Sequence, residues 1–443
     1  MISSTRARYS HFFAVVARVF FALTIFFIPF RWRLVLLHRP HPPVYSDYTD
    51  FLIFASDLTL LYMLVFWAFS LLLSPRKLKA GPVLMWISLV GLTLAGWVSV
   101  PGSEDALLSR FHAVRFVILL LFYLFIVNEI RSVGWVIWPV GAQILFQSVI
   151  AILQVTSQAS LGLQKYGELT LDPATLGTSI IFADGFRFLR GYGLSDHPNI
   201  LGGCIAFGLV LLLAIILHRN LRARILASIV FLPCLLALVM TFSRSAWLSF
   251  FVAGSFMVGC EALARRWKPV KRAILLGVLS MLIVMPFITQ NISLFQSRLN
   301  SGNAVENDPL RERGFLLDAG NTIFAEHIAL GIGLGAAPLA MKNRFENFPL
   351  NYQPPHYAIL VVAMETGVLG GVFYLLLLLV PALSFALRWK ACIDKPRMMG
   401  TFALLLAVFV VGLFDYYTWL YAPGRLWQWM AWGLFSAAWK ETI

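Results

Sequence analysis

The chain has 443 residues, of which 59% are hydrophobic and 13% are charged, and its mean hydropathy is +0.79. Soluble domains are about 45–50% apolar and about 25% charged, so this composition excludes a soluble globular protein. The formal net charge is +14. A charge of this sign points either to nucleic acid or to an anionic membrane surface.

Long apolar runs recur along nearly the whole chain. About 20 residues of helix cross a hydrocarbon core of about 30 Å, whereas a β-barrel would show short alternating strands. The sequence therefore predicts an all-α fold, a polytopic transmembrane helix bundle of about 12 spans. The predicted spans are 12–30, 50–73, 82–100, 111–128, 134–156, 198–217, 222–241, 245–263, 272–289, 356–387, 399–418 and 424–439.

The short connections between these spans differ sharply in their content of lysine and arginine. Basic residues concentrate in cytoplasmic connections, which predicts that both termini are cytoplasmic. Anionic lipid headgroups then account for much of the positive charge; membrane lipids are predicted partners and nucleic acid is not. The lysines and arginines predicted to lie on the cytoplasmic side are Arg6, Arg8, Arg76, Lys77, Lys79, Arg131, Arg219, Arg222, Arg224, Arg265, Arg266, Lys268, Lys271, Arg272, Arg388, Lys390, Lys395, Arg397 and Lys440.

Two connections on the opposite, periplasmic side are long. We divide the chain into 1–289, with spans one to nine and a periplasmic loop near 157–197, a large periplasmic loop at 290–355, and 356–443 with spans ten to twelve. In the large loop, Asn307 or Asp308 is predicted to cap a helix that continues to about Glu326. Three glycines, Gly331, Gly333 and Gly335, are then expected to interrupt helical structure before Pro338.

Unusual polar residues precede span six, in the segment FRFLRGYGLSDHPNILGG. Arg187 and Arg190 come first, and His197 and Asn199 flank Pro198 at the membrane boundary. A helix cap with a tight turn explains Asp196, Pro198 and Asn199 as well as a binding role does. That interpretation leaves Arg190 unexplained.

Arg244 lies in MTFSRSAWLSF between spans seven and eight, where a very tight turn at the outer interface is predicted. Its guanidinium either snorkels to the interface from a helix end or faces the protein interior to meet an anion.

The large loop returns to span ten through YQPPHYAILVVAMETGVLGG. His356 directly follows two prolines, at the outer end of this span. Gly367 and Gly371 form a pair of small residues that favours close helix packing. Glu365 lies about half a turn round the helix from His356, so we do not pair them.

These segments together resemble the O-antigen ligase and O-antigen polymerase superfamily of bacterial envelope enzymes. The resemblance consists of the SRSAW turn, the outward loop with its arginine-bearing helix and GIGLG stretch, and PPH at the start of a span that ends ETGVLGG. It covers about residues 185–375. Many members have asparagine after the histidine, whereas Tyr357 follows His356 here, which puts the local partner of the histidine in doubt.

The resemblance implies a glycosyltransferase at the periplasmic face of the bacterial inner membrane, with an undecaprenyl diphosphate-linked glycan as donor. Negative charge develops on the leaving diphosphate, and arginine binds phosphate bidentately. We therefore predict His356 as the general base, with Arg244 and Arg190 as catalytic cations and no metal or other cofactor. The predicted binding residues for the diphosphate or for lipid A-core are Arg187, His197, Asn199, Arg311 and Arg313, the last two being equally compatible with a solvated helix that pairs them with Glu312.

Several alternatives stay open. An O-antigen ligase uses lipid A-core as acceptor, and a loop that is basic in places (Arg298, Arg311, Arg313, Lys342, Arg344) favours this anionic partner. An O-antigen polymerase would extend the glycan on its lipid carrier, and a protein O-oligosaccharyltransferase would use a protein hydroxyl. A transporter or lipid flippase without chemistry is the alternative from another class. The sequence does not decide whether Asp57 or Asp415 is functional.

Overall fold

The computed structural model describes the backbone of residues 2–299, 304–346, 348 and 351–440, and it excludes from description the side chains of 2–4, 299, 304–310 and 440. The described residues form mainly helices, with two small antiparallel sheets. The first half contains α1 (Ile2–Phe27), β1 (Arg33–Leu37), β2 (Phe51–Phe54), α2 (Ala55–Leu73), α3 (Val83–Val98), α4 (Ala106–Glu129), α5 (Gly134–Ser157), β3 (Ile180–Ala183), β4 (Phe186–Leu189), α6 (Pro198–His218) and α7 (Leu221–Met240). The second half contains α8 (Arg244–Leu263), α9 (Trp267–Gln290), α10 (Ile292–Leu299), α11 (Ala304–Glu326), α12 (Ala337–Arg344), α13 (Ala358–Arg388), α14 (Lys395–Gly412), α15 (Tyr417–Leu420) and α16 (Ala422–Lys440).

Eleven helices among the described residues are long and apolar enough to cross a membrane. They correspond to the first eleven predicted spans, which confirms the all-α polytopic membrane bundle. The predicted twelfth span, 424–439, forms α16 but is not among the eleven. Its described side chains are nearly all buried and include the polar residues Arg425 and Gln428, so α16 is an internal helix of the bundle.

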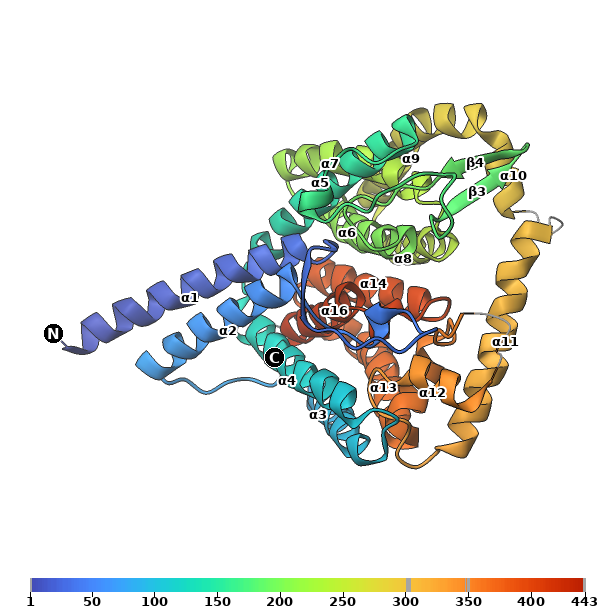
Figure 1. The fold of residues 1–443 in the computed structure, drawn as a ribbon. Coiled ribbons are helices and arrows are strands. Elements are labelled where there is room, and N and C mark those ends of the chain that lie inside the picture. The colour runs from blue at the N-terminus through green and yellow to red at the C-terminus, as the bar shows by residue number, and fades with distance from the viewer. Residues whose placement is uncertain (1, 300–303, 347, 349–350, 441–443) are drawn as a thin grey trace.

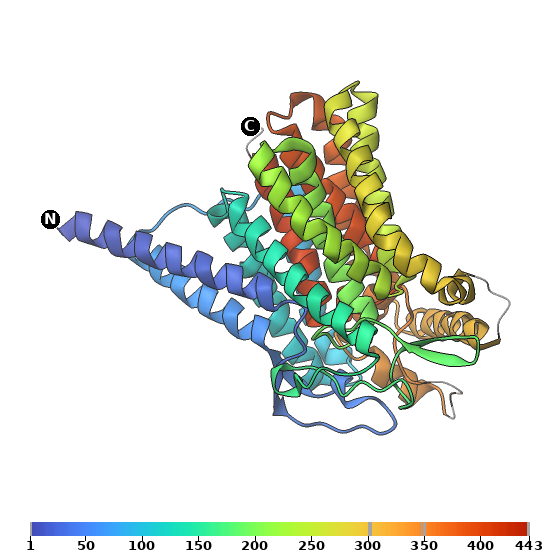
Figure 2. The same cartoon turned by 90° about the horizontal axis from the view of Figure 1, so that it is seen from above.

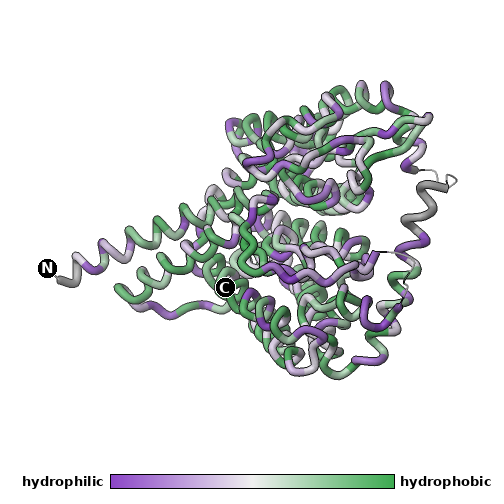
Figure 3. Tube along the Cα trace, viewed as in Figure 1, coloured by the Kyte–Doolittle hydropathy of each residue, from purple (hydrophilic) through white to green (hydrophobic). Residues whose placement is uncertain are grey.

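The helices form a bundle from which α1 and α2 project together (Figure 1). In this view α5–α9 form one group, α3, α4, α12 and α13 form another, and α14 and α16 lie between them. Nearly every residue of α6 is buried, as expected of a helix that is apolar all round. Hydrophobic residues predominate along the helices and hydrophilic ones in the connecting segments (Figure 3).

One end of the bundle carries the long connecting segments, and we call it the loop face. The described residues of 28–54, 158–197 and 291–357 gather there (Figure 2), together with the short turns at 241–243 and 413–416. Strand β1 pairs with β2, with Arg33 opposite Phe54, and β3 pairs with β4, with Ile180 opposite Leu189. Helix α11 runs along one side of the molecule from α10 to α12 (Figure 1).

Several predicted boundaries were wrong. The predicted span 12–30 begins at Ile2 and ends at Phe27, and the span predicted from residue 50 begins at Ala55 because Phe51–Phe54 pair with β1. The predicted span 399–418 ends at Gly412, before the short helix α15. Helix α11 already begins at Ala304, upstream of the predicted caps Asn307 and Asp308, whose side chains lie outside the described residues.

The role predicted for Gly367 was also wrong. This glycine breaks α13 with φ 70° and ψ −178°, and a Cβ there would lie 2.3 Å from the carbonyl oxygen of Ala329. The backbone of 328–333 fits into the break, because Ile332 N donates to Met364 O (2.8 Å) and Val368 N donates to Ile328 O (2.8 Å). Because Gly367 has no side chain, it leaves room for the backbone of the large loop; it does not serve the close packing of a neighbouring helix. The glycines Gly331, Gly333 and Gly335 have positive φ and interrupt helical structure as predicted.

Candidate active site

His356 lies at the loop face, between Pro355 and the start of α13. Its ring packs against that of Tyr416, with 4.9 Å between the ring centroids. Its Nδ1 atom lies 3.6 Å from Oδ1 of Asp415, in the turn that follows α14. This distance is longer than a hydrogen bond, so the carboxylate acts on the imidazole through its charge. The structure thereby supplies a partner for the histidine that its sequence neighbour Tyr357 does not.

A chain of polar side chains continues from Asp415 into the protein. Asn199, in the first turn of α6, donates from Nδ2 to Asp415 Oδ2 (3.1 Å) and accepts at Oδ1 from Nη2 of Arg190 (2.6 Å). Arg190 is 4% exposed, so its charge is held in the interior by these contacts. The result is a connected series from guanidinium to amide to carboxylate to imidazole.

Arg190 also forms hydrogen bonds to two other segments of the chain. Its Nε donates to the carbonyl oxygen of Thr241 (2.7 Å), in the turn between α7 and α8, and its Nη1 donates to Ser179 Oγ (2.7 Å). A guanidinium has five N–H donors in a fixed plane, which suits it to join three segments at once. Arg190 is consequently placed to hold Asn199, not to meet a ligand directly.

The electrostatic environment favours a charged Asp415 and a neutral His197. Burial raises the pKa of Asp415, but the opposing influence of His356 and of Arg313 is larger, so its pKa is below the usual value. Burial, assisted by the charge of Arg190, lowers the pKa of His197 to about 3. His197 accepts a hydrogen bond at Nδ1 from Asn199 N (3.1 Å) and so caps α6.

His356, Asp415, Asn199 and His197 line one cavity of about 400 Å³ at the loop face. Arg31 and several tyrosines from distant parts of the chain complete its wall; they include Tyr45, Tyr48, Tyr352, Tyr416, Tyr417 and Tyr421. Among the described residues, no group of three or more His, Cys, Asp or Glu side chains is arranged to hold a metal ion. The cavity thus offers an imidazole beside a carboxylate, surrounded by hydroxyl groups.

A comparison with protein families matches residues 229–375 to the model described as O-antigen ligase. This segment, 147 of the 443 residues, is therefore similar to the O-antigen ligase family. The match confirms the superfamily resemblance found in the sequence. No curated protein matches the chain.

The O-antigen ligase segment supplies only part of the cavity. It contains Arg244, the large loop and His356. The residues that position the histidine, Asp415, Asn199 and Arg190, come from outside it. The site is therefore assembled from the family segment and from helices on both sides of it in sequence.

The remaining predicted site residues are four arginines. Arg313, on α11, is partly buried and close enough to Asp415 to lower the pKa of that carboxyl. Arg244 begins α8, is partly buried, and donates from Nη1 to Arg298 O (3.3 Å). Arg311 is exposed, and Arg187 is exposed on β4, where its Nε donates to Pro173 O. None of these four arginines is among the residues that line the cavity.

Sequence reasoning missed the contribution of residues 28–54. Arg31 Nε and Arg33 Nη1 both contact Asp196 Oδ1 (2.8 and 3.0 Å), and Arg33 also binds Asp47 (2.6 Å). In the predicted orientation these arginines lie on the non-cytoplasmic side, where the positive-inside bias gives no reason for them. That anomaly could have identified them, but the segment was assigned to the end of span one and its connection.

Proposed function

We propose that the protein is a glycosyltransferase that moves an O-antigen glycan from an undecaprenyl diphosphate carrier to lipid A-core at the periplasmic face of the inner membrane. The family of residues 229–375 supports ligase- or polymerase-type chemistry in general. The single observation that carries the specific proposal is the polar series that ends at His356 in the loop-face cavity.

The reaction assigned to this site is one in-line displacement. The acceptor hydroxyl oxygen attacks the anomeric carbon, the bond from that carbon to the phosphate oxygen breaks, and the diphosphate leaves with its electron pair. His356 takes the hydroxyl proton as the new bond forms, as a general base must, and the configuration at the anomeric carbon inverts. Asp415 stabilises the resulting imidazolium by its charge at 3.6 Å.

Positive side chains are needed where the diphosphate develops charge. We assign this role to Arg313, whose charge lowers the pKa of Asp415, and to Arg244 at the start of α8. Arg190 is assigned a positioning role, because its three nitrogens bind Thr241, Ser179 and Asn199. Arg31, which lines the cavity, is a further cation for the donor or the acceptor.

The experiment is reconstitution of the purified protein in liposomes with the lipid-linked glycan and lipid A-core. Wild-type protein is expected to form glycan attached to lipid A-core, and His356→Ala is expected to form none. The matched control is His327→Ala, because His327 is an exposed histidine of the same loop. Turnover by His356→Ala at the wild-type rate would remove the proposed base.

The acceptor distinguishes the remaining alternatives. Longer glycans that stay on the carrier would identify a polymerase, and absence of any new glycosidic bond would favour a transporter. The basic loop supports lipid A-core less strongly than the sequence indicated, because Arg344 is bound by Glu326 through contacts of 2.8–3.0 Å.

A further inference from the structure

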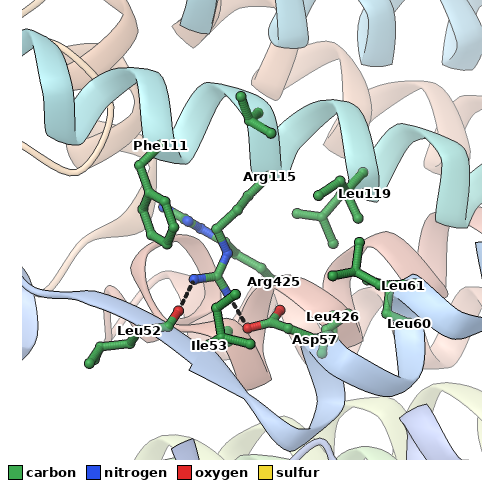
Figure 4. Close-up of a pocket in the computed structure, with 13 residues that line it drawn as sticks. Leu52, Ile53, Asp57, Leu60, Leu61, Phe111, Arg115, Leu119, Arg425 and Leu426 are labelled. Atoms are coloured by element: carbon green, nitrogen blue, oxygen red, sulfur yellow. Dashed lines mark hydrogen bonds and ion pairs between the residues drawn. The ribbon is translucent and has the colours of Figure 1, made fainter. Parts of the chain in front are cut away.

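A second cavity, of about 170 Å³, lies between α2, α4 and α16, away from His356 (Figure 4). It shares no lining residue with the loop-face cavity. Its walls are mainly aliphatic, with Leu60, Leu61 and Leu119 among them. Leu61 and Val114 also line it and are 37% and 48% exposed, so the cavity reaches the outer surface of the bundle, where membrane-spanning helices face lipid.

Two guanidinium groups stand in this apolar cavity. Arg115, from α4, contacts Asp57 Oδ2 (2.6 Å) and donates to Leu52 O (3.0 Å), as Figure 4 shows. Arg425, from α16, is 3% exposed; its Nε donates to Trp419 O and its Nη1 lies 3.0 Å from His112 Nδ1. Its Nη2 has no hydrogen-bond partner among the described residues.

The acidic side chains nearby do not satisfy both guanidiniums. Asp57 is the one carboxylate in the lining, and it is bound by Arg115. Glu365 lies within electrostatic range of Arg425, but it accepts from Trp419 Nε1 (2.8 Å). A buried guanidinium nitrogen without a partner is costly. An anion with an apolar tail would satisfy both the nitrogen and the aliphatic wall.

We propose that this cavity binds the phosphate group of one membrane lipid, with a phosphate oxygen on Arg425 Nη2 and an apolar chain along Leu60, Leu61 and Leu119. Phosphate is favoured because arginine binds its oxygens with matched geometry. This binding does not depend on the proposed glycosyl transfer.

The site also lies next to the wall of the His356 cavity. A small cavity of about 30 Å³ lies between the two. It shares Tyr48 and Tyr421 with the His356 cavity, and Leu52 and Arg115 with the proposed lipid site. The small cavity therefore connects the walls of the proposed lipid site and of the polar cavity.

The test is native mass spectrometry of the full-length protein released from nanodiscs of a phosphate-free glycolipid. Phosphatidylglycerol, lipid A or undecaprenyl phosphate is added as a minor component in separate arms. One phosphate-bearing lipid is expected to remain bound. Arg425→Gln is expected to reduce its retention about tenfold or more, because a hydrogen bond to a charged group is lost. Arg110→Gln is the matched control, since Arg110 is an exposed arginine on α4.

Two further variants keep Arg425 and decide the question if Arg425→Gln does not fold. Leu61→Trp fills the apolar part and is expected to reduce retention, whereas Asp57→Asn frees Arg115 and is expected to increase it. The arm that retains lipid identifies which phosphate-bearing lipid is bound. Equal retention of the phosphate-free lipid, or wild-type retention by a folded Arg425→Gln, would overturn the proposal. If Arg425→Gln does not fold, wild-type retention by both Leu61→Trp and Asp57→Asn would overturn it.

Discussion

Replacement of Asp415 by asparagine tests the electrostatic part of the site without a change in size. Two opposite unit charges about 4 Å apart interact by about 4 kcal/mol at an effective dielectric constant of about 20, and the measured separation from His356 is 3.6 Å. If about half of the imidazolium charge has developed in the transition state, Asp415→Asn should cost about 2 kcal/mol. That corresponds to a fall in kcat of about 30-fold.

The assay is the reconstituted transfer reaction, with kcat and KM measured separately. KM for the donor should change little, because Asp415 acts on the base and not on the diphosphate, and Asp415→Glu should recover part of kcat. The control is Asp318→Asn, since Asp318 is an exposed aspartate on α11. An unchanged kcat in Asp415→Asn, or a loss expressed only in KM, would refute the assigned role.

Three other predictions concern the surroundings of this pair. Arg190→Gln should lower both the thermal midpoint and kcat, since each hydrogen bond from its charged group is worth about 1.5–3 kcal/mol; Arg187→Gln is the exposed control, and equal effects of the two would contradict the burial argument. The pKa of His197 is about 3 in the folded protein and about 6.5 when unfolded, so the unfolded state binds the proton first and stability falls as pH drops below 6.5. His197→Asn keeps a hydrogen-bond acceptor for the helix cap. When the pH is lowered from about 6.5 to 5, its free energy of unfolding, measured by denaturant titration, should fall by about 2 kcal/mol less than that of the wild type. Identical dependence of the unfolding free energy on pH in the two proteins would count against this role of His197. Gly367→Ala should lower the thermal midpoint in detergent because a Cβ there meets the loop backbone, whereas Gly259→Ala, which has nothing within 4 Å, should not; equal midpoints would rule out the close contact.

The sequence predicted the parts of the structure that depend on hydrophobic length and on chain order. Apolar runs located the spans, and the tight turn before Arg244 follows from the few polar residues between α7 and α8. The paired prolines placed His356 at the start of α13, as found. These features are local, so composition and turn chemistry determine them.

The partners of His356 could not be predicted, because they depend on packing between distant segments. Asp415 is 59 residues beyond His356, and Asn199 is 216 residues before Asp415. The polar character of Asn199 fitted a helix cap equally well, and the sequence did not decide whether Asp415 is functional. The sequence also failed at Gly367, where a spacing typical of helix packing instead admits a loop backbone.

The break at Gly367 divides α13 into two helical segments. The short unit from Ala358 to Thr366 carries His356 at its beginning and is joined by hydrogen bonds to the loop backbone at its end, through Met364 O and Glu365 O. The longer unit runs on into the bundle. The position of the imidazole is therefore set by the large loop more than by the membrane helix below it, so a displacement of that loop by a bound sugar lipid would be transmitted to the 3.6 Å gap in front of Asp415.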